Sequence, residues 1–335
     1  MSDGLTALPM RDRFGRRIDY LRISVTDKCN LRCVYCMPVE GLPWIPREEL
    51  LTDDEIVRVV REFAALGTRR LRITGGEPTV RPGLAELVRR LAAVPGIEDI
   101  ALSTNGVLLP KMAAELRAAG VRRVNISLDT LREDRFERIA RRPARVYREI
   151  REGIEAAEAA GFDPVKINVV VLRGWNDDEI EDFAALTRER PWHVRFIELM
   201  PTGANLEIVD AFISADEILA RVRALGTLEP VPGPLGNGPA RYYAFPGAPG
   251  TVGVITPLSH TYCMRCNRVR LLADGQLRTC LFGTHQVDLR TPLRAGRPLG
   301  PVILDALAEK PERHYLQLGS DVGSGGLLAL SQTGG

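Results

Sequence analysis

Residues 21–36 run Leu-Arg-Ile-Ser-Val-Thr-Asp-Lys-Cys-Asn-Leu-Arg-Cys-Val-Tyr-Cys, a segment that combines a strand pattern with closely spaced cysteines. Its first part, residues 21–26, is rich in aliphatic and β-branched side chains and predicts a strand. The loop that follows carries Cys29, Cys33 and Cys36 in a C-x3-C-x2-C spacing. Ligands on a loop at the carboxyl end of a strand lie on the catalytic face of a β/α barrel. The stretch therefore predicts a barrel with a metal site at that face.

The spacing of these three cysteines favours an iron–sulfur cluster. Three thiolates can hold three irons of a [4Fe–4S] cube and leave the fourth iron open, whereas electron-transfer clusters usually take four cysteines. An open iron is what a chelating substrate or cofactor needs. The alternative is a zinc knuckle or unbonded thiols, but zinc normally takes four ligands in a closed structural site. The histidine nearest in sequence is His193, so no histidine lies near this loop.

Strand-like and helix-like segments alternate from this first strand onward. Strands are predicted at residues 21–26, 70–74, 99–104, 123–128, 165–172 and 194–200, and helices at residues 51–67, 84–93, 111–119, 146–160 and 177–190. The first helix begins with a capping box formed by Thr52 and Glu55. Regular alternation favours a parallel sheet with helices outside it. Six such strands favour an α/β fold of the partial (β/α)6 TIM-like barrel type over a doubly wound sheet.

The regular alternation of predicted strands and helices ends after Met200. A Pro- and Gly-rich stretch, residues 230–239, is typical of a boundary or linker. The other segments expected here are a helix at residues 214–225, strands at 241–245 and 252–256, and a hairpin of 268–273 with 276–280 around Asp274-Gly275. We therefore expect a barrel region in residues 1–229 and a smaller C-terminal α+β region in residues 230–335.

A second group of cysteines lies in this C-terminal region. Cys263, Cys266 and Cys280 have a C-x2-C-x13-C spacing. One interpretation is a zinc site completed by His260 or His285, because C-x2-C is also zinc spacing and both histidines are close in sequence. The other is a second cluster with an open iron. These residues alone leave both interpretations open.

Composition narrows the class of protein. The chain has 335 residues, 6% aromatic residues and a net charge of +2, so no global field attracts nucleic acid or an acidic membrane. No segment reaches the length of an apolar membrane span, and the first 17 residues contain no apolar core of a secretory signal. We therefore expect a cytoplasmic protein, in which the six cysteines are metal ligands or free thiols rather than disulfides.

Two motifs together resemble the radical S-adenosylmethionine (SAM) superfamily. The first is the C-x3-C-x2-C loop with the aromatic Tyr35 before its last cysteine, and the second is Thr74-Gly-Gly-Glu-Pro78 after the second strand. The resemblance implies that the first cluster is a [4Fe–4S] cluster that binds SAM, and that the Gly-Gly-Glu-Pro segment contacts the amino group of SAM. Two glycines allow close backbone approach, and a carboxylate with turn carbonyls can receive an ammonium. Alone, this segment would be a turn with a solvated acid.

Within that superfamily, the chain is similar to the family of GTP 3′,8-cyclases. The similarity extends from Phe14-Gly15-Arg16 through residues 263–282 to the terminal Gly334-Gly335. It implies a radical SAM lyase that converts GTP into (8S)-3′,8-cyclo-7,8-dihydroguanosine 5′-triphosphate, the first step of molybdenum cofactor biosynthesis. It also implies that Cys263, Cys266 and Cys280 hold a second [4Fe–4S] cluster, whose open iron binds the guanine. Residues 330–333 depart from the apolar pattern of the family, so the docking of the tail is left open.

The resemblance also assigns contacts to individual residues. The SAM contacts implied are Tyr35, Gly76, Ser127 and Met200, and the GTP contacts implied are Arg22, Arg72, Ser103, Lys166, Arg195, Arg268, Val269 and Arg270. Arg268 and Arg270 are also expected to act in catalysis by stabilising a reduced guanine intermediate. Several of these cations come from predicted barrel strands, where a charge is costly to bury unpaired and a triphosphate would compensate it. The alternative is that each cation pairs with an acid or lies at an exposed strand end.

The family's chemistry implies the reaction and its partners. A 5′-deoxyadenosyl radical from SAM removes hydrogen from C3′ of GTP, and the C3′ radical attacks C8 of the guanine. The expected partners are GTP, a second copy in a homodimer, an electron donor and a downstream cyclic pyranopterin monophosphate synthase, with no nucleic acid and no membrane. One rival is another radical SAM enzyme with an auxiliary cluster, such as a peptide maturase. Another is a non-catalytic zinc protein that binds nucleic acid.

Overall fold

A computed structural model describes residues 10–202, 205–234, 236, 238–314, 316 and 328–334. The strands are β1 (Met10–Arg11), β2 (Arg17–Ile18), β3 (Tyr20–Ser24), β4 (Arg70–Thr74), β5 (Asp99–Thr104), β6 (Arg123–Ser127), β7 (Val165–Val171), β8 (His193–Glu198), β9 (Glu229–Val231), β10 (Arg241–Ala244), β11 (Thr251–Ile255), β12 (Arg268–Leu271), β13 (Gln276–Arg278) and β14 (Val287–Asp288). The helices are α1 (Asp53–Ala65), α2 (Leu84–Ala92), α3 (Leu109–Ala119), α4 (Glu133–Ala140), α5 (Ala144–Ala159), α6 (Ile180–Glu189), α7 (Ala215–Arg223), α8 (Arg290–Arg294), α9 (Gly300–Ala308) and α10 (Leu330–Thr333). Short 3-10 turns are η1 (Arg47–Glu49), η2 (Pro78–Val80), η3 (Asp177–Glu179), η4 (Leu206–Ala211) and η5 (Cys263–Arg265).

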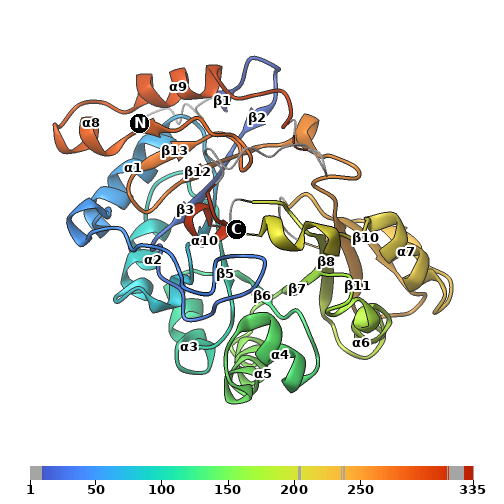
Figure 1. Cartoon of the computed structure of the whole chain (residues 1–335). Coiled ribbons are helices and arrows are strands. Elements are labelled where there is room, and N and C mark those ends of the chain that lie inside the picture. Colours follow the sequence, from blue (N-terminus) through green and yellow to red (C-terminus); the bar gives the residue numbers. More distant parts are fainter. Residues whose placement is uncertain are drawn as a thin grey trace.

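One large sheet organises the molecule. Its twelve strands follow the order β14-β13-β12-β3-β4-β5-β6-β7-β8-β11-β10-β9, and β1 and β2 form a separate hairpin. The central strands β3 to β8 are parallel and adjacent in chain order. Figure 1 shows them around the middle of the molecule, with α1 to α6 outside. In the described part of the chain β14 and β9 do not pair, so the expected partial, open barrel is confirmed.

Alternation along each strand separates the apolar core from the barrel interior. In β3, Leu21 and Ile23 are buried in the hydrophobic core between sheet and helices, so the alternate residue Arg22 faces the interior. Parallel register carries the pattern sideways, because Leu21 is opposite Leu71 and Arg22 is opposite Arg72. Burying each such aliphatic side chain contributes roughly 1.5–3 kcal/mol. The helices therefore pack on one face of the sheet, and the other face is left for polar chemistry.

The first helix forms as its sequence predicts. The Thr52 hydroxyl accepts a hydrogen bond from the backbone N–H of Glu55, and the Glu55 carboxylate accepts one from the backbone N–H of Thr52, so the capping box is confirmed. The residues Ile56, Val60 and Phe63, spaced three or four apart, are buried against the sheet.

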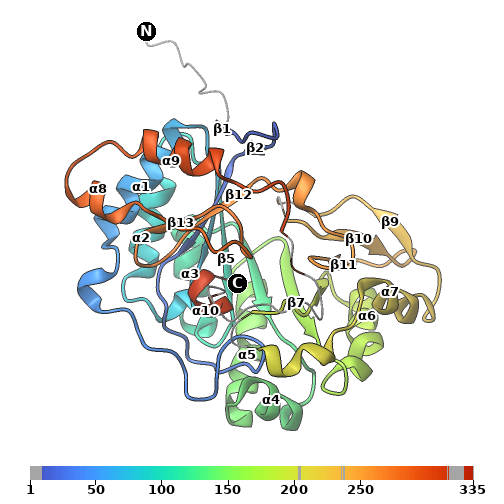
Figure 2. The same cartoon turned by 45° about the horizontal axis from the view of Figure 1, so that its top comes forward.

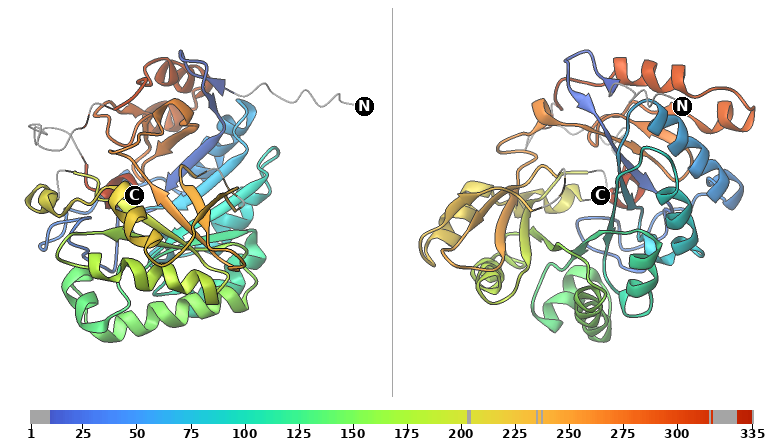
Figure 3. Two further views of the ribbon diagram at one scale, coloured as in Figure 1. Left: turned by 90° about the vertical axis from the view of Figure 1, so that its right-hand side faces the viewer. Right: turned by 180° about the vertical axis from the view of Figure 1, so that it is seen from behind.

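The C-terminal region joins the same sheet on both sides. β12 runs parallel to β3, and β11 runs parallel to β8, with β10 and β9 beyond it. Figures 2 and 3 show these late strands on either side of the central ones. They also show α10 near the middle of the open barrel. β9 crosses the expected boundary between residues 229 and 230. The two sequence regions therefore share one sheet, and the boundary stays a prediction about the sequence.

Across the described ranges, each helix is too short or too polar to pass through a lipid bilayer.

Candidate active site

Cys29, Cys33 and Cys36 lie on the loop that follows β3, as their place in the sequence predicts. All are free thiols and line one cavity, here called the first cavity, together with residues after β4, β5 and β6. Burial raises the pKa of Cys29 to about 11 and that of Cys36 to about 12. At neutral pH such thiols stay protonated unless a metal takes the place of the proton. The donor set thus suits a bound metal centre better than free reactive thiolates.

The cysteines do not converge on a single point. Among the residues that the structure describes, no three His, Cys, Asp or Glu side chains lie close enough together to hold one metal ion. A [4Fe–4S] cube presents a different iron to each cysteine, so its ligands stay apart, whereas tetrahedral zinc requires convergence. The described residues therefore give no support to the zinc interpretation, and the cube stays a prediction from the number and spacing of the cysteines.

Gly75 and Gly76 let the turn after β4 pack directly on the cysteine loop. A Cβ on Gly75 would lie 2.4 Å from the Thr26 carbonyl, and one on Gly76 would lie 2.4 Å from the Lys28 carbonyl. The backbone N–H of Gly76 donates to the Thr26 carbonyl at 2.8 Å, and that of Glu77 to the Lys28 carbonyl at 2.7 Å. Both glycines are therefore needed for protein packing, beyond the ligand approach that the sequence suggested.

The Glu77 carboxylate, which the sequence offered to the ammonium of SAM, is occupied by the protein. It accepts hydrogen bonds from the Thr79 backbone and hydroxyl at 3.0 and 2.5 Å, from the Thr104 hydroxyl at 2.7 Å and from the Asn105 backbone at 2.6 Å. Burial raises the pKa of Glu77. This acid therefore joins the ends of β4 and β5.

The four candidate SAM residues come together at the first cavity. Tyr35, Gly76, Ser127 and Met200 all contribute to its lining. The Tyr35 hydroxyl donates to Asp129 at 2.7 Å, and burial raises the pKa of Asp129 to about 6. Asp129 lies two residues after Ser127, but no pattern in the sequence marked it as a site residue.

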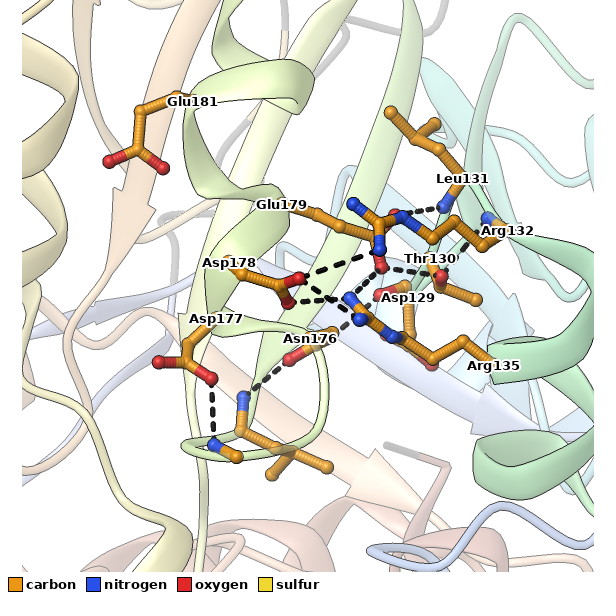
Figure 4. Close-up of polar contacts among 12 residues, drawn as sticks. Asp129, Thr130, Leu131, Arg132, Arg135, Asn176, Asp177, Asp178, Glu179 and Glu181 are labelled. Carbon is orange, nitrogen blue, oxygen red and sulfur yellow. Dashed lines mark hydrogen bonds and ion pairs between the residues drawn. The ribbon is translucent and has the colours of Figure 1, made fainter.

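The buried acid Glu179 holds in place the segment after β6, which lines the first cavity. Glu179, in η3, accepts hydrogen bonds at 2.6 Å from the Thr130 hydroxyl and from Arg135. Asn176 donates to the Asp129 carbonyl at 2.6 Å. Figure 4 shows these bonds linking the segment after β6 to the turn before α6. They fix the backbone that carries Asp129.

The candidate GTP cations form a ring on the inner face of the sheet. Arg22 is opposite both Arg72 and Arg270 across neighbouring strands, and β7 and β8 contribute Lys166 and Arg195. Arg72 donates to the Tyr20 hydroxyl at 2.7 Å and to the Ser103 hydroxyl at 3.2 Å. Arg195 donates to Asn168. Neutral partners thus orient the guanidinium groups without cancelling their charge.

The ring carries more buried positive charge than the protein neutralises. Within the part of the chain described, Arg72, Arg195, Arg268 and Arg270 form no ion pair with a carboxylate, and the buried Nε atoms of Arg195 and Arg268 have no hydrogen-bond partner. Burial, followed by repulsion from Arg195, lowers the pKa of Lys166 to about 6. Burial, with repulsion from Arg268, lowers that of Arg270 to about 10. A polyanion would relieve these costs.

Val269 differs from its neighbours in β12. Its side chain is buried in the hydrophobic core, on the opposite face from Arg268 and Arg270. Only its backbone is available for a substrate contact.

The second cysteine group lines a second cavity. Cys263, Cys266 and Cys280 surround it together with Arg268, Arg270, Tyr262, Thr279, Phe282 and His314. The histidines that the sequence offered as zinc ligands are not among its lining residues, and His260 instead bonds Asp216 at 2.7 Å. His314 lies 34 residues beyond Cys280 in the chain, so spacing gave no signal for it. The two cysteine groups thus lie at separate cavities. Arg268 and Arg270 of the cation ring line the second cavity, and Arg72 reaches the first one through its hydrogen bond to Ser103.

The described part of the tail docks inside the barrel. The Gly334 carbonyl accepts hydrogen bonds from Arg22 at 2.6 Å, from Thr74 at 3.1 Å and from Arg270 at 3.2 Å. Leu330 and Ser331 line the first cavity. The docking that the sequence left open therefore occurs for residues 330–334, whereas Gly335 lies outside the described residues.

Two family models match the chain. The radical SAM superfamily model matches residues 23–187, and the Molybdenum Cofactor Synthesis C model matches residues 192–316. The first covers β3 to α6 with the first cysteine group, and the second covers the later strands with the second group.

Curated relatives match nearly the whole chain. A GTP 3′,8-cyclase of Pelotomaculum thermopropionicum is 51% identical over 92% of this chain and 95% of its own length. A GTP 3′,8-cyclase of Moorella thermoacetica is 50% identical over 92% of this chain and 96% of its own length. Among solved structures, SuiB of Streptococcus suis bound to precursor peptide SuiA has a TM-score of 0.59 at 14% identity, covering 88% of this chain and 71% of that one. That likeness concerns the fold alone.

Proposed function

Because this chain belongs to the family of GTP 3′,8-cyclases within the radical SAM superfamily, we propose that it cyclises GTP to (8S)-3′,8-cyclo-7,8-dihydroguanosine 5′-triphosphate. This reaction is the first step of molybdenum cofactor biosynthesis. The observation that carries the proposal is the cation ring: its Arg268 and Arg270 line the second cavity, and its Arg72 donates to Ser103, which lines the first cavity. A nucleoside triphosphate is a ligand whose charge and length suit that arrangement.

At the first cavity, Cys29, Cys33 and Cys36 would hold a [4Fe–4S] cluster, and Tyr35, Gly76, Ser127 and Met200 would hold SAM. The cluster with SAM supplies a 5′-deoxyadenosyl radical when both are bound. The protein's own part is to position SAM against the nucleotide and to exclude water. The fixed Tyr35–Asp129 pair and the docked tail support both roles.

At the second cavity, Cys263, Cys266 and Cys280 would hold a second [4Fe–4S] cluster that binds the guanine. Arg22, Arg72, Lys166 and Arg195, together with Ser103, would bind the triphosphate and ribose, with a backbone contact from Val269. Arg268 and Arg270 belong to the ring and also line the second cavity, so they can also stabilise negative charge that develops on the base. Holding both ends of GTP fixes the sugar near the first cavity, which is a proximity effect.

The proposal includes partners that follow from the family. We expect a homodimer, an external one-electron donor and a downstream cyclic pyranopterin monophosphate synthase that accepts the product. A cytoplasmic location agrees with six cysteines that are all free thiols.

The direct test is anaerobic incubation with reductant, SAM and GTP, followed by mass spectrometry of the nucleotides. We expect 5′-deoxyadenosine and the cyclised nucleotide in equal amounts, and neither from the Cys29→Ser variant. Formation of 5′-deoxyadenosine without any cyclised nucleotide would reject GTP as the substrate and favour another radical SAM enzyme with an auxiliary cluster.

A further inference from the structure

Lys310, just after α9, is a lysine with an unusually buried side chain, and it lies beside the second cysteine group. Its side chain is among the largest fully buried ones in the described structure, with 2% exposure. Burying an ammonium is costly unless an anion and hydrogen-bond acceptors surround it. The Lys310 ammonium donates to the Arg268 carbonyl at 3.1 Å and to the Thr279 carbonyl, and it lies 3.7 Å from the Cys266 sulfur. An ammonium has three donors, and these three contacts use them all.

The only group among these contacts that can carry negative charge is Cys266. The two carbonyls are neutral, and within the described ranges Lys310 forms no ion pair with an acid. Cysteine binds metals as a thiolate, so a metal-bound Cys266 would supply the negative charge that the buried ammonium needs.

The chain segment 310–314 lies beside all three cysteines of the second group or beside their neighbours in the chain. The Lys310 ammonium lies 3.7 Å from the Cys266 sulfur, and His314 lines the second cavity together with Cys263. The Thr279 carbonyl that Lys310 binds belongs to the residue directly before Cys280.

Arg16 holds this segment in place. Its guanidinium donates to the Pro311 and Glu312 carbonyls, both at 2.6 Å, and to the Cys263 carbonyl at 2.9 Å. An ion pair with Asp12 at 2.5 Å fixes Arg16 itself. The position of Lys310 is thus enforced by contacts that do not involve the cysteine sulfurs.

We propose that Lys310 is a positioning residue of the second cysteine triad, whose ammonium balances the Cys266 thiolate and joins the segments that carry Cys266 and Cys280. The inference rests on the proposed second cluster. Net charge and hydrogen bonds to the sulfurs set the potential of such a cluster. A one-electron reduction adds negative charge, so a nearby ammonium stabilises the reduced state, and its loss makes the potential more negative.

The test compares four variants, each reconstituted anaerobically beside the wild-type protein. Lys310→Gln keeps amide donors for the carbonyls but removes the charge, Lys310→Met removes both, and Lys310→Arg keeps the charge. Lys111→Met, on the exposed side of α3, is the matched control for loss of a lysine. The measurements are iron and sulfide per chain and a redox titration followed by electron paramagnetic resonance, with the signal of the first cluster as an internal standard.

We expect Lys310→Gln to shift the second cluster to a more negative potential, and Lys310→Met to shift it further and to lose up to about half of the bound iron. Lys310→Arg and Lys111→Met should stay close to the wild-type protein, and the first cluster should not change. If Lys310→Met fails to fold, Lys310→Gln carries the same comparison.

Two results would count against the inference in distinguishable ways. Two clusters in the wild-type protein, with the same potentials and iron content in Lys310→Gln, would overturn the role of Lys310 alone. A single cluster in the wild-type protein would overturn the proposed second cluster, and the role of Lys310 with it.

Discussion

Burial and neighbouring guanidinium groups both lower the pKa of the Lys166 ammonium. Burial, Arg195, Arg123 and Arg72 all lower its pKa, against a smaller opposite effect of Asp99, and the result is a pKa of about 6. Without a ligand this lysine is therefore mostly neutral at neutral pH. A bound triphosphate would restore the proton, because a nearby anion favours the charged form. The positive charge of the cation ring would therefore increase when the triphosphate binds.

This predicts that GTP binding takes up a proton. Below about pH 6 Lys166 is already charged, so no uptake is expected; above it, binding raises the pKa and uptake approaches one proton. Affinity should therefore fall as pH rises from about 6 toward the pKa of the bound state. Calorimetric titration with GTP in buffers of different ionisation enthalpy measures the uptake directly.

Lys166→Met is the matching variant for that experiment. It should abolish this proton uptake and weaken GTP binding by about 10- to 100-fold, the usual effect of one charged hydrogen bond. Undiminished uptake in Lys166→Met would assign the proton to another group.

At the scale of elements, the sequence predicted what depends on local periodicity. The strand β4 and the first helix follow directly from alternation and capping, and their observed bounds agree closely with the expected ones. Helix α4 was not predicted, because its eight residues are mostly charged and only Phe136, Ile139 and Ala140 are buried. The short segments β1, β2, β14, α8 and α10 have too few residues to show a period.

The candidate site was predictable to a similar extent. Its cysteines were revealed by their spacing, whereas its strand cations were implied by the resemblance to the family and lie on predicted strands. His314 reaches the second cavity, and Lys310 reaches Cys266, only through tertiary packing, because the segment that carries them is held by Arg16 from the other end of the chain. Glu77 has a motif position, but its occupied carboxylate could be seen only with the neighbouring turn in place.

The turn after β4 gives a matched pair of glycine substitutions. In Gly76→Ala the new Cβ would meet backbone carbonyls of Asp27 and Lys28 at 2.5 and 2.4 Å, so the cysteine loop must move. In Gly174→Ala nothing lies within 4 Å, and only the positive φ of 73° is strained, at a cost of about 1 kcal/mol. We expect Gly76→Ala to lose the first cluster and Gly174→Ala to keep it, measured by iron content and thermal unfolding. Normal cluster content in Gly76→Ala would show that the loop can yield.

At the scale of the molecule, both sides of the central sheet depend on the last third of the chain. β12 covers the outer edge of β3, and β11 covers that of β8. A protein ending at residue 229 would leave both edges unpaired and would cut through β9. We expect it to aggregate or to unfold without cooperativity in size-exclusion chromatography and calorimetry. A soluble fragment with a sharp transition near that of the full chain would instead establish residues 1–229 as an independent domain.

The pairing of β3 with β12 also determines when the barrel can be completed during synthesis of the chain. These strands are about 250 residues apart, so a ribosome adding about 5–20 residues per second needs roughly 12–50 s between them. Throughout that interval the nascent chain already displays Cys29, Cys33 and Cys36, while the strand leading to them lacks one neighbour. The machinery that delivers iron and sulfide thus meets an unfinished barrel, and chaperones guarding that edge would govern how much of the newly made protein matures.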